Sequence, residues 1–381
     1  MKLTCSLRRV TLVVTAALTL LLAMAPQLVG GTLYTQTNLV SNSSATPAAF
    51  TDPNLINPWG NVSNGGSPFW VSDQGTGLST LYSTPPGTPL SLVVTVPAVG
   101  TPPAVGPTGI VANTTGFNVD GAPAAFIFST LDGTIAGWNG SPTLTQAVTE
   151  ATVAGAVFTG LAQATNASGT FLYASDFANN KIDVFNSSYA QVSLSGNFTD
   201  PNLPKGYAPY NIQTVNGQLY VEYDPVGPNG LPLPGDGNGI VDVFDTNGNF
   251  VKTLIPKGGS ALNDPWGIAL APASFGQFGG DLLVGNFGNG WINAFNPATG
   301  AFVGTLDLTG GQPFAEASLW SLDFGIGGSG GTSGVLYFTA GLTNQTGGLL
   351  GSVSTTPEPA TLTLLGSGLI GLLRLRRRQK R

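Results

Sequence analysis

Histidine is absent from this sequence of 381 residues, and its only cysteine is Cys5, which precedes the first long apolar run. Without histidine, the commonest general base, the Ser-His-Asp triad and imidazole metal ligands are all excluded. No arginine lies between residues 10 and 373, and the only cysteine precedes this region. The region therefore offers neither a guanidinium clamp for phosphate nor a thiolate nucleophile. The lack of these catalytic residue types favours a non-enzymatic protein, and we expect no cofactor beyond a possible Ca²⁺.

Charge is also scarce, because only 8% of the residues are charged. Most basic residues lie at the two ends of the chain, and the region between them holds only Lys181, Lys205, Lys252 and Lys257. Eighteen acidic residues share that region, so it is strongly acidic. This charge excludes a nucleic-acid partner, which requires a basic surface, and it repels anionic surfaces.

The first residues have the pattern of a secretory signal peptide. A basic start, residues 1–9, is followed by an apolar run, residues 10–24, and by small residues around Ala25. We expect residues 1–31 to form this segment, with cleavage after Ala25 or near Gly30. A membrane anchor that is not removed is the alternative.

The last residues are more specific. Residues 357–359 read Pro-Glu-Pro, residues 360–373 are apolar, and an arginine-rich end follows. A helix of fourteen residues would span about 21 Å, short of the roughly 30 Å of a bilayer core. The elements of this signal are Pro357, Glu358, Pro359, Arg374, Arg376, Arg377 and Arg378.

This order of parts closely resembles the PEP-CTERM sorting signal of Gram-negative bacteria. The resemblance covers residues 354–381. It implies an exported protein that crosses the inner membrane, is held there transiently by its tail, and is processed by an exosortase. It also implies an association with exopolysaccharide, at the cell surface or in the secreted matrix. Whether the tail is cut or kept as an anchor stays open.

A short motif recurs between these two ends at intervals of about fifty residues. In most copies a small or aromatic residue and a glycine open an apolar strand, and the high glycine and proline content fits many strands joined by tight turns. Six copies at this period predict an all-β, six-bladed β-propeller of four-stranded antiparallel blades. The copies are Pro58-Trp59-Gly60, Pro107-Thr108-Gly109, Phe158-Thr159-Gly160, Pro209-Tyr210-Asn211, Pro265-Trp266-Gly267 and Leu319-Trp320-Ser321.

The last repeat is incomplete, because the sorting tail begins where its fourth strand should be. A spare strand-like segment, residues 33–40, stands before the first repeat. We expect it to supply the missing outer strand and to close the ring, which removes an unpaired sheet edge. The propeller should therefore span residues 32–353.

The body is also similar to a family of secreted bacterial propellers related to NHL repeats, for which no activity is assigned. Four segments carry the resemblance, and it implies the fold but no function. They are residues 57–60 (Asn-Pro-Trp-Gly), 70–73 (Trp-Val-Ser-Asp), 235–245 (from Gly-Asp-Gly-Asn-Gly to Val-Asp-Val-Phe-Asp) and 283–288 (Leu-Val-Gly-Asn-Phe-Gly).

One face of the propeller is the candidate binding face. In propellers, the loops before the inner strands and those between second and third strands surround one channel mouth. Aromatic rings beside carboxylates and amides suit sugars, since the ring stacks on an apolar sugar face while the polar groups take hydroxyls. The alternative is that the rings pack between blades and the polar residues only form turns. The residues are Trp59, Tyr210, Trp266, Trp320, Asp73, Asp176 and Asn286.

A proline- and glycine-rich insert, residues 224–239, contains a possible calcium loop. Asp224, Asp236 and Asn238 supply oxygen ligands of the kind that Ca²⁺ takes, but the glutamate that ends an EF-hand loop is missing. A plain hairpin loop is the alternative.

Together these patterns predict a monomeric, exported binding or structural module associated with exopolysaccharide or with surface proteins. Two alternatives stay open. One is a Ca²⁺-dependent hydrolase or lyase whose carboxylates come from Asp73, Asp176 and Asp224 at the channel mouth. The other is a platform for protein partners that uses the same face.

Overall fold

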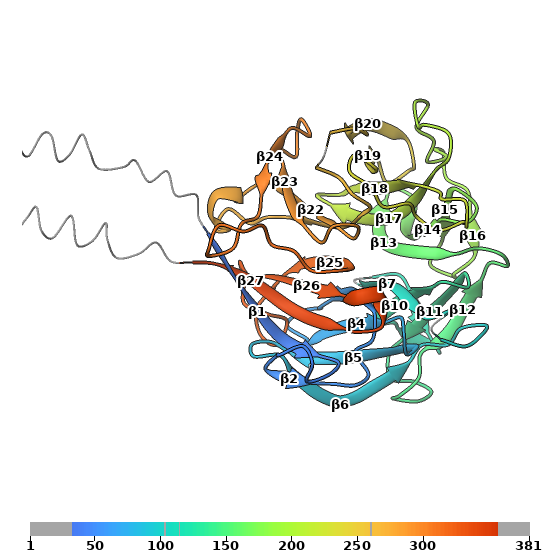
Figure 1. Ribbon diagram of the computed structural model, residues 1–381. Coiled ribbons are helices and arrows are strands. Elements are labelled where there is room, and N and C mark those ends of the chain that lie inside the picture. The colour runs from blue at the N-terminus through green and yellow to red at the C-terminus, as the bar shows by residue number, and fades with distance from the viewer. Residues whose placement is uncertain (1–32, 103, 114, 260, 357–381) are drawn as a thin grey trace, which may run out of the picture. The chain divides into compact units, whose positions relative to one another are not determined.

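Six blades built on four antiparallel strands each are arranged around a central channel and make up most of the described part of the chain (Figure 1). The computed structural model describes residues 33–102, 104–113, 115–259 and 261–356. Blade 1 contains β3 (Pro58–Val62), β4 (Phe69–Asp73), β5 (Leu78–Ser83) and β6 (Thr88–Thr95). Blade 2 contains β7 (Pro107–Ala112), β10 (Phe126–Thr130), β11 (Thr134–Trp138) and β12 (Val148–Thr152).

The next three blades repeat this order, with the first strand innermost. Blade 3 contains β13 (Phe158–Asn166), β14 (Gly169–Asp176), β15 (Lys181–Phe185) and β16 (Gln191–Val192). Blade 4 contains β17 (Tyr207–Val215), β18 (Gln218–Pro225), β19 (Ile240–Phe244) and β20 (Phe250–Ile255). Blade 5 contains β21 (Pro265–Leu270), β22 (Leu282–Asn286), β23 (Ile292–Phe295) and β24 (Phe302–Thr305). The predicted six-bladed fold is thereby confirmed.

Blade 6 joins the two ends of the propeller. It contains β25 (Leu319–Phe324), β26 (Leu336–Ala340), β27 (Leu349–Thr355) and then β1 (Tyr34–Ser41), which pairs antiparallel with β27 from Tyr34↔Thr355 to Ser41↔Leu349. Figure 1 shows the blue β1 alongside the red β27. The ring therefore closes through the N-terminal strand, as the incomplete last repeat predicts.

Three small features were not expected from the repeat. A fifth strand, β2 (Phe50–Thr51), pairs parallel with the end of β1, and a short hairpin of β8 (Asn118–Val119) and β9 (Ala122–Pro123) extends blade 2. Two single-turn 3₁₀ helices lie at Gly276–Phe278 and Thr343–Gln345. Within the described ranges, no helix has the length and apolar character needed to cross a membrane.

The hydrophobic core is divided among the interfaces between neighbouring blades. Each of six apolar clusters combines side chains from two adjacent blades, and the cluster between blades 6 and 1 includes Leu39 and Val40 of β1. Since every blade buries its faces only against its neighbours, the closing strand is needed to complete two of these clusters, one on each side of blade 6.

The glycine of the repeated motif lies where inner strands of adjacent blades come close. A methyl group added at Gly109 would lie 2.4 Å from the backbone nitrogen of Leu161, and one added at Gly267 would lie 2.4 Å from the carbonyl oxygen of Trp320. Glycine is therefore required by the approach of the next blade.

Two blades replace this glycine, and in both the new side chain bridges to the next blade. Asn211 donates through Nδ2 to the carbonyl oxygen of Trp266 at 2.5 Å, and Ser321 donates through Oγ to Oδ1 of Asn61 at 2.5 Å. The second contact links blade 6 to blade 1 beside the channel. At this motif position, glycine lets consecutive blades approach closely, whereas asparagine or serine connects them by a hydrogen bond.

Candidate functional site: the central cavity

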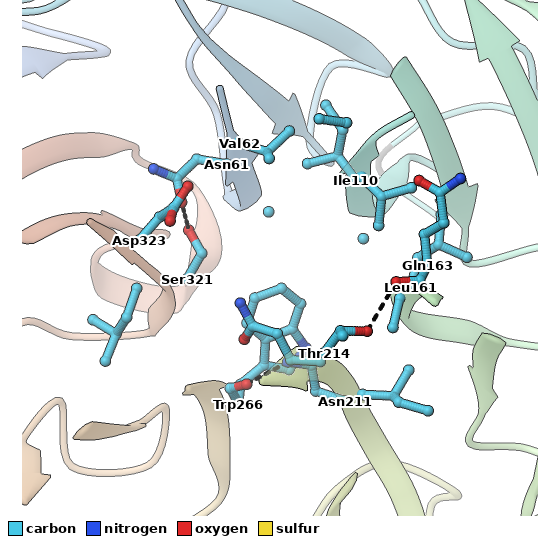
Figure 2. A pocket seen from close by; sticks show the side chains of 18 residues that line it. Asn61, Val62, Ile110, Leu161, Gln163, Asn211, Thr214, Trp266, Ser321 and Asp323 are labelled. Atoms are coloured by element: carbon cyan, nitrogen blue, oxygen red, sulfur yellow. Dashed lines mark hydrogen bonds between the residues drawn. The ribbon is translucent and has the colours of Figure 1, made fainter. Parts of the chain in front are cut away.

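A cavity of about 290 Å³ occupies the central channel and is lined by the inner strands of all six blades. Figure 2 shows these side chains arranged in a ring around it. The blade 2 and blade 3 walls are largely apolar, with Ile110 and Leu161, whereas Gln213 and Thr214 line the blade 4 wall. The indole of Trp266 also lies against the cavity. The space is therefore large enough for a small molecule or for one end of a longer one.

One group of polar side chains in the cavity lies between blades 6 and 1. Asp323, on β25, lies beside Asn61, on β3, and both flank Ser321 (Figure 2). Asn61 is 7% exposed, and its Oδ1 accepts the Ser321 hydroxyl while its buried Nδ2 has no hydrogen-bond partner among the described residues. A buried amide without a partner costs free energy, and a bound acceptor group would recover it.

Asp323 is the only charged residue among those that line the cavity. It is partly exposed to the cavity, yet the surrounding protein withholds water from its carboxylate and raises its pKa to about 7; a hydrogen bond from the Phe324 backbone opposes the shift. The side chain can therefore donate or accept a proton near neutral pH. Such a group suits a hydroxyl-rich ligand, which both donates and accepts hydrogen bonds.

The four aromatic residues of the expected binding face are packed against one another at the start of the inner strands. The Trp59 and Trp320 rings stack with centroids 3.7 Å apart, and Trp266 meets both edge-on at 5.9 and 5.6 Å. Tyr210 lies 6.4 Å from Trp59, and all four side chains are at most 5% exposed. We call this group the aromatic plug. The rings therefore pack against one another between blades, which is the alternative to a ligand-binding role.

Hydrogen bonds across the channel hold the aromatic plug. Trp266 donates through Nε1 to the carbonyl oxygen of Thr159 in blade 3, at 2.9 Å. Trp320 donates through Nε1 to Oδ1 of Asn57 ahead of blade 1, also at 2.9 Å. Of the expected face residues, Trp266 alone lines the cavity, so the open space lies farther along the inner strands than the sequence suggested.

The polar residues of the expected face are buried in the hairpins between second and third strands. Asp73 accepts the Thr80 hydroxyl at 2.8 Å, and Asp176 accepts Nδ2 of Asn179 at 2.7 Å. Asn286 accepts the backbone N–H of Asn263 at 2.8 Å. Burial raises the pKa of both aspartates. These contacts are those of turn-forming side chains, and the proposed ligand-binding role of these residues stays a prediction.

A group of buried acids lies between blades 4 and 5. The Glu222, Asp224 and Asp264 side chains are fully buried, and Asp224 and Asp264 lie close enough to share a proton. Burial raises the pKa of Asp224 far above its usual value, and the neighbouring Asp264 carboxylate adds to the shift. Burial therefore favours the protonated, neutral form of these acids.

The possible calcium loop is stabilised by its own contacts. Asn238 donates through Nδ2 to the Leu233 carbonyl oxygen at 3.0 Å, and Asp236 accepts Nδ2 of Asn263 at 2.9 Å. Asp224 is buried whereas Asp236 is exposed. Across the described residues, no three acidic, histidine or cysteine side chains form a group that could hold a metal ion. The calcium hypothesis for these residues rests on sequence alone.

The cavity residues Asn61, Ser321 and Asp323 were missed by sequence reasoning. A signal was present, because aligning the six motifs places Gln213 and Asp323 where blades 1 to 3 carry Val62, Val111 and Ala162. A polar residue in an otherwise apolar strand position indicates a special environment. Residues 357–381, which include all seven elements of the sorting signal, lie outside the described part of the chain.

Comparison with known proteins finds relatives over most of the chain and a sorting-motif match near its C-terminus. Over 336 residues the sequence is 34% identical to the uncharacterized protein R648 of Acanthamoeba polyphaga mimivirus, covering 83% of this chain and 78% of that protein. The chain belongs to the family of R648. Protein L690 of the same virus is 31% identical over 335 residues, covering 83% of this chain and 84% of L690.

Residues 355–378 match the PEP-CTERM protein-sorting motif. In Gram-negative bacteria this motif implies export, sorting to the surface and processing by exosortase-type machinery. A streptogramin B lyase structure superposes on the R648-family chain with a TM-score of 0.50 at 13% identity, covering 86% of this chain and 98% of the lyase. At that identity the likeness concerns the propeller fold alone.

Proposed function

We propose that this member of the R648 family is an exported carbohydrate-binding protein of the cell surface, whose central cavity holds one end of an exopolysaccharide chain. The observation that supports this most directly is the cavity lining. Asp323, Ser321 and Asn61 gather on one side, and Trp266 lies near Asn211 and Thr214 at another part of the wall. The carboxylate, hydroxyl and amide groups provide hydrogen bonds for sugar hydroxyls, and Ile110 and Leu161 on the blade 2 and blade 3 walls provide a surface for an apolar sugar face.

The size of the site limits what it accepts. A cavity of about 290 Å³ enclosed by six strands admits the end of a chain but not its middle. The ligand should therefore be a terminal sugar unit, and fragments with a free end should bind better than the intact polymer at equal mass.

Calorimetric titration with fragments of the native exopolysaccharide, beside a glycan array, tests this proposal. The variant Asp323→Asn removes the charge and should weaken binding at least tenfold at pH 8. Asp120→Asn removes an equal charge from an exposed position in blade 2 and should bind like the unchanged protein. Binding that is absent, or equal in all three proteins, contradicts the proposal.

A carboxylate-based hydrolase or lyase is the second candidate, favoured by the raised pKa of Asp323 in the cavity. Chromatography of exopolysaccharide fragments after incubation with the protein separates the two functions. Product formation that Asp323→Asn abolishes supports an enzyme, whereas unchanged fragments with Asp323-dependent binding support a binding protein. Metal analysis of the purified protein tests the Ca²⁺-dependent version.

A further inference from the structure

A second hollow lies on the outer side of the propeller, between blades 4 and 5. It has a volume of about 390 Å³ and is bounded by the segment that follows β20 and by β23 and β24 of blade 5. We call it the rim groove. It is distinct from the central cavity, because none of its lining residues belongs to an inner strand.

The rim groove contains the two exposed aromatic side chains of the described residues. Trp291 is 36% exposed and Phe302 is 54% exposed, and both line this groove. Every other described aromatic residue is buried or half-buried. Large aromatic rings left in water beside a hollow indicate a binding surface, since burial would otherwise be favourable.

Sheet geometry presents both rings on the same face of blade 5. Trp291 immediately precedes β23; it, Asn293 and Phe295 are spaced two residues apart and all line the groove, and Phe302 pairs with Phe295 on the neighbouring strand. Four strand steps of about 3.3 Å place the backbone of Trp291 roughly 13 Å from that of Phe295. The Trp291 and Phe302 rings therefore lie apart along the groove, and Asn293 lies between them.

Local contacts position the Trp291 backbone and the Phe302 ring before any ligand arrives. The Trp291 backbone donates to Oδ1 of Asn289 at 3.1 Å and accepts from the Asn286 backbone at 2.9 Å. Phe302 rests edge-on against the buried Phe295 ring, with centroids 5.8 Å apart. A fixed backbone at Trp291 and a preformed Phe302 ring reduce the ordering cost of binding.

The groove between the rings is polar but uncharged. Thr305 donates its hydroxyl to Oδ1 of Asn293 at 2.7 Å, and because Asn293 is only 1% exposed, the half-buried Thr305 oxygen is the atom of this pair that can accept from an incoming hydroxyl. No lining residue is charged, which complements an uncharged ligand, and the acidic body repels anionic polymers. A stable protein interface needs about 1,000 Å² around an apolar centre, and two separated rings do not provide such a centre.

We propose that the rim groove binds a strand of neutral polysaccharide, with sugar units stacked on Trp291 and on Phe302. This site would contact the middle of a polymer, in contrast to the terminal unit proposed for the central cavity. The inference does not depend on that proposal, because the residues and the ligand segment differ.

Affinity electrophoresis of the mature protein through gels containing dextran, mixed-linkage β-glucan, galactomannan or the acidic polymer alginate tests the inference. We expect at least one neutral polymer to retard the protein, and Trp291→Ala and Phe302→Ala each to weaken the retardation at least tenfold. Val303→Ala is the matched control, because Val303 neighbours Phe302, is 48% exposed and does not line the groove. Thermal melting verifies that each variant is folded.

Asp323→Asn should leave this retardation unchanged, so that failure of the cavity proposal and failure of the groove proposal can be told apart. The inference is overturned if no neutral polymer retards the protein, or if retardation is insensitive to both ring substitutions. Retention by alginate alone, or ring-dependent capture of a protein without polysaccharide binding, overturns it as well.

Discussion

At the scale of single residues, the glycine position of the repeated motif has a structural role in most blades, but in blade 6 it holds Ser321, which lines the central cavity. Glycine allows the next inner strand to approach, whereas Ser321 in the last copy contacts Asn61 and brings it beside Asp323. A residue that departs from the repeat in this propeller thus marks the place where a ligand could be held.

The titration of Asp323 gives the proposed sugar binding a pH dependence. Its pKa is raised to about 7, so the carboxylate forms as the pH rises from 6 to 8. A carboxylate accepts stronger hydrogen bonds from sugar hydroxyls than a protonated carboxyl does. Titration calorimetry should therefore show tighter binding at pH 8 than at pH 6, and a flat profile for Asp323→Asn. Tighter binding at pH 6 would contradict the assigned role.

The motif glycines can be tested by stability. Gly267→Ala places a methyl group 2.4 Å from the Trp320 carbonyl oxygen, so it should lower the free energy of unfolding by about 1–3 kcal/mol. Gly285→Ala, in the neighbouring strand, meets only leucine side-chain ends at 3.1 Å or more and should cost less. Urea denaturation measures both changes. Equal losses would show that the close approach of the blades is not what requires glycine.

At the scale of elements, β1 decides whether the ring is closed. Its first residue, Tyr34, is fully buried and stacks on Phe278 with centroids 5.9 Å apart. Its hydroxyl donates to the Phe275 carbonyl oxygen at 3.0 Å. Tyr34 therefore attaches β1, which completes blade 6, to the loop between β21 and β22 of blade 5.

Substitutions at Tyr34 separate packing from hydrogen bonding. Tyr34→Ala empties a core position and should lower the free energy of unfolding by about 3–5 kcal/mol, as for other buried aromatic residues. Tyr34→Phe keeps the ring and should cost about 1 kcal/mol for the lost hydrogen bond. Chemical denaturation followed by tryptophan fluorescence reports both. If the two variants lost equal stability, packing by the ring would not be the main contribution of Tyr34.

At the scale of the whole molecule, buried carboxyl groups make the propeller sensitive to pH. Asp73, Glu222, Asp224 and Asp323 all have pKa values raised by burial. In the unfolded chain these groups titrate near pH 4. Their protonated forms are favoured in the folded state, so their contribution to stability is complete below pH 4 and is lost as the pH rises through their folded pKa values.

Thermal melting at constant ionic strength should therefore show a lower melting temperature at pH 8.5 than at pH 5.5. Each unit of pKa shift corresponds to about 1.4 kcal/mol. Asp224→Asn removes one buried carboxyl and should flatten the profile. A melting temperature that rises with pH would show that these carboxylates are stabilised by contacts other than those described.

The sequence by itself determined the class, the number of blades and the closing strand, because a fifty-residue repeat allows each unit to bury its faces only against similar units. It also determined the sorting motif, which is read as a linear order of residues. Only the tertiary structure decided that Trp59, Tyr210, Trp266 and Trp320 stack into a plug, because rings from four blades meet only when the ring has closed. The same closure placed Asp323 beside Asn61, residues that are far apart in the chain and come together where the last blade meets the first.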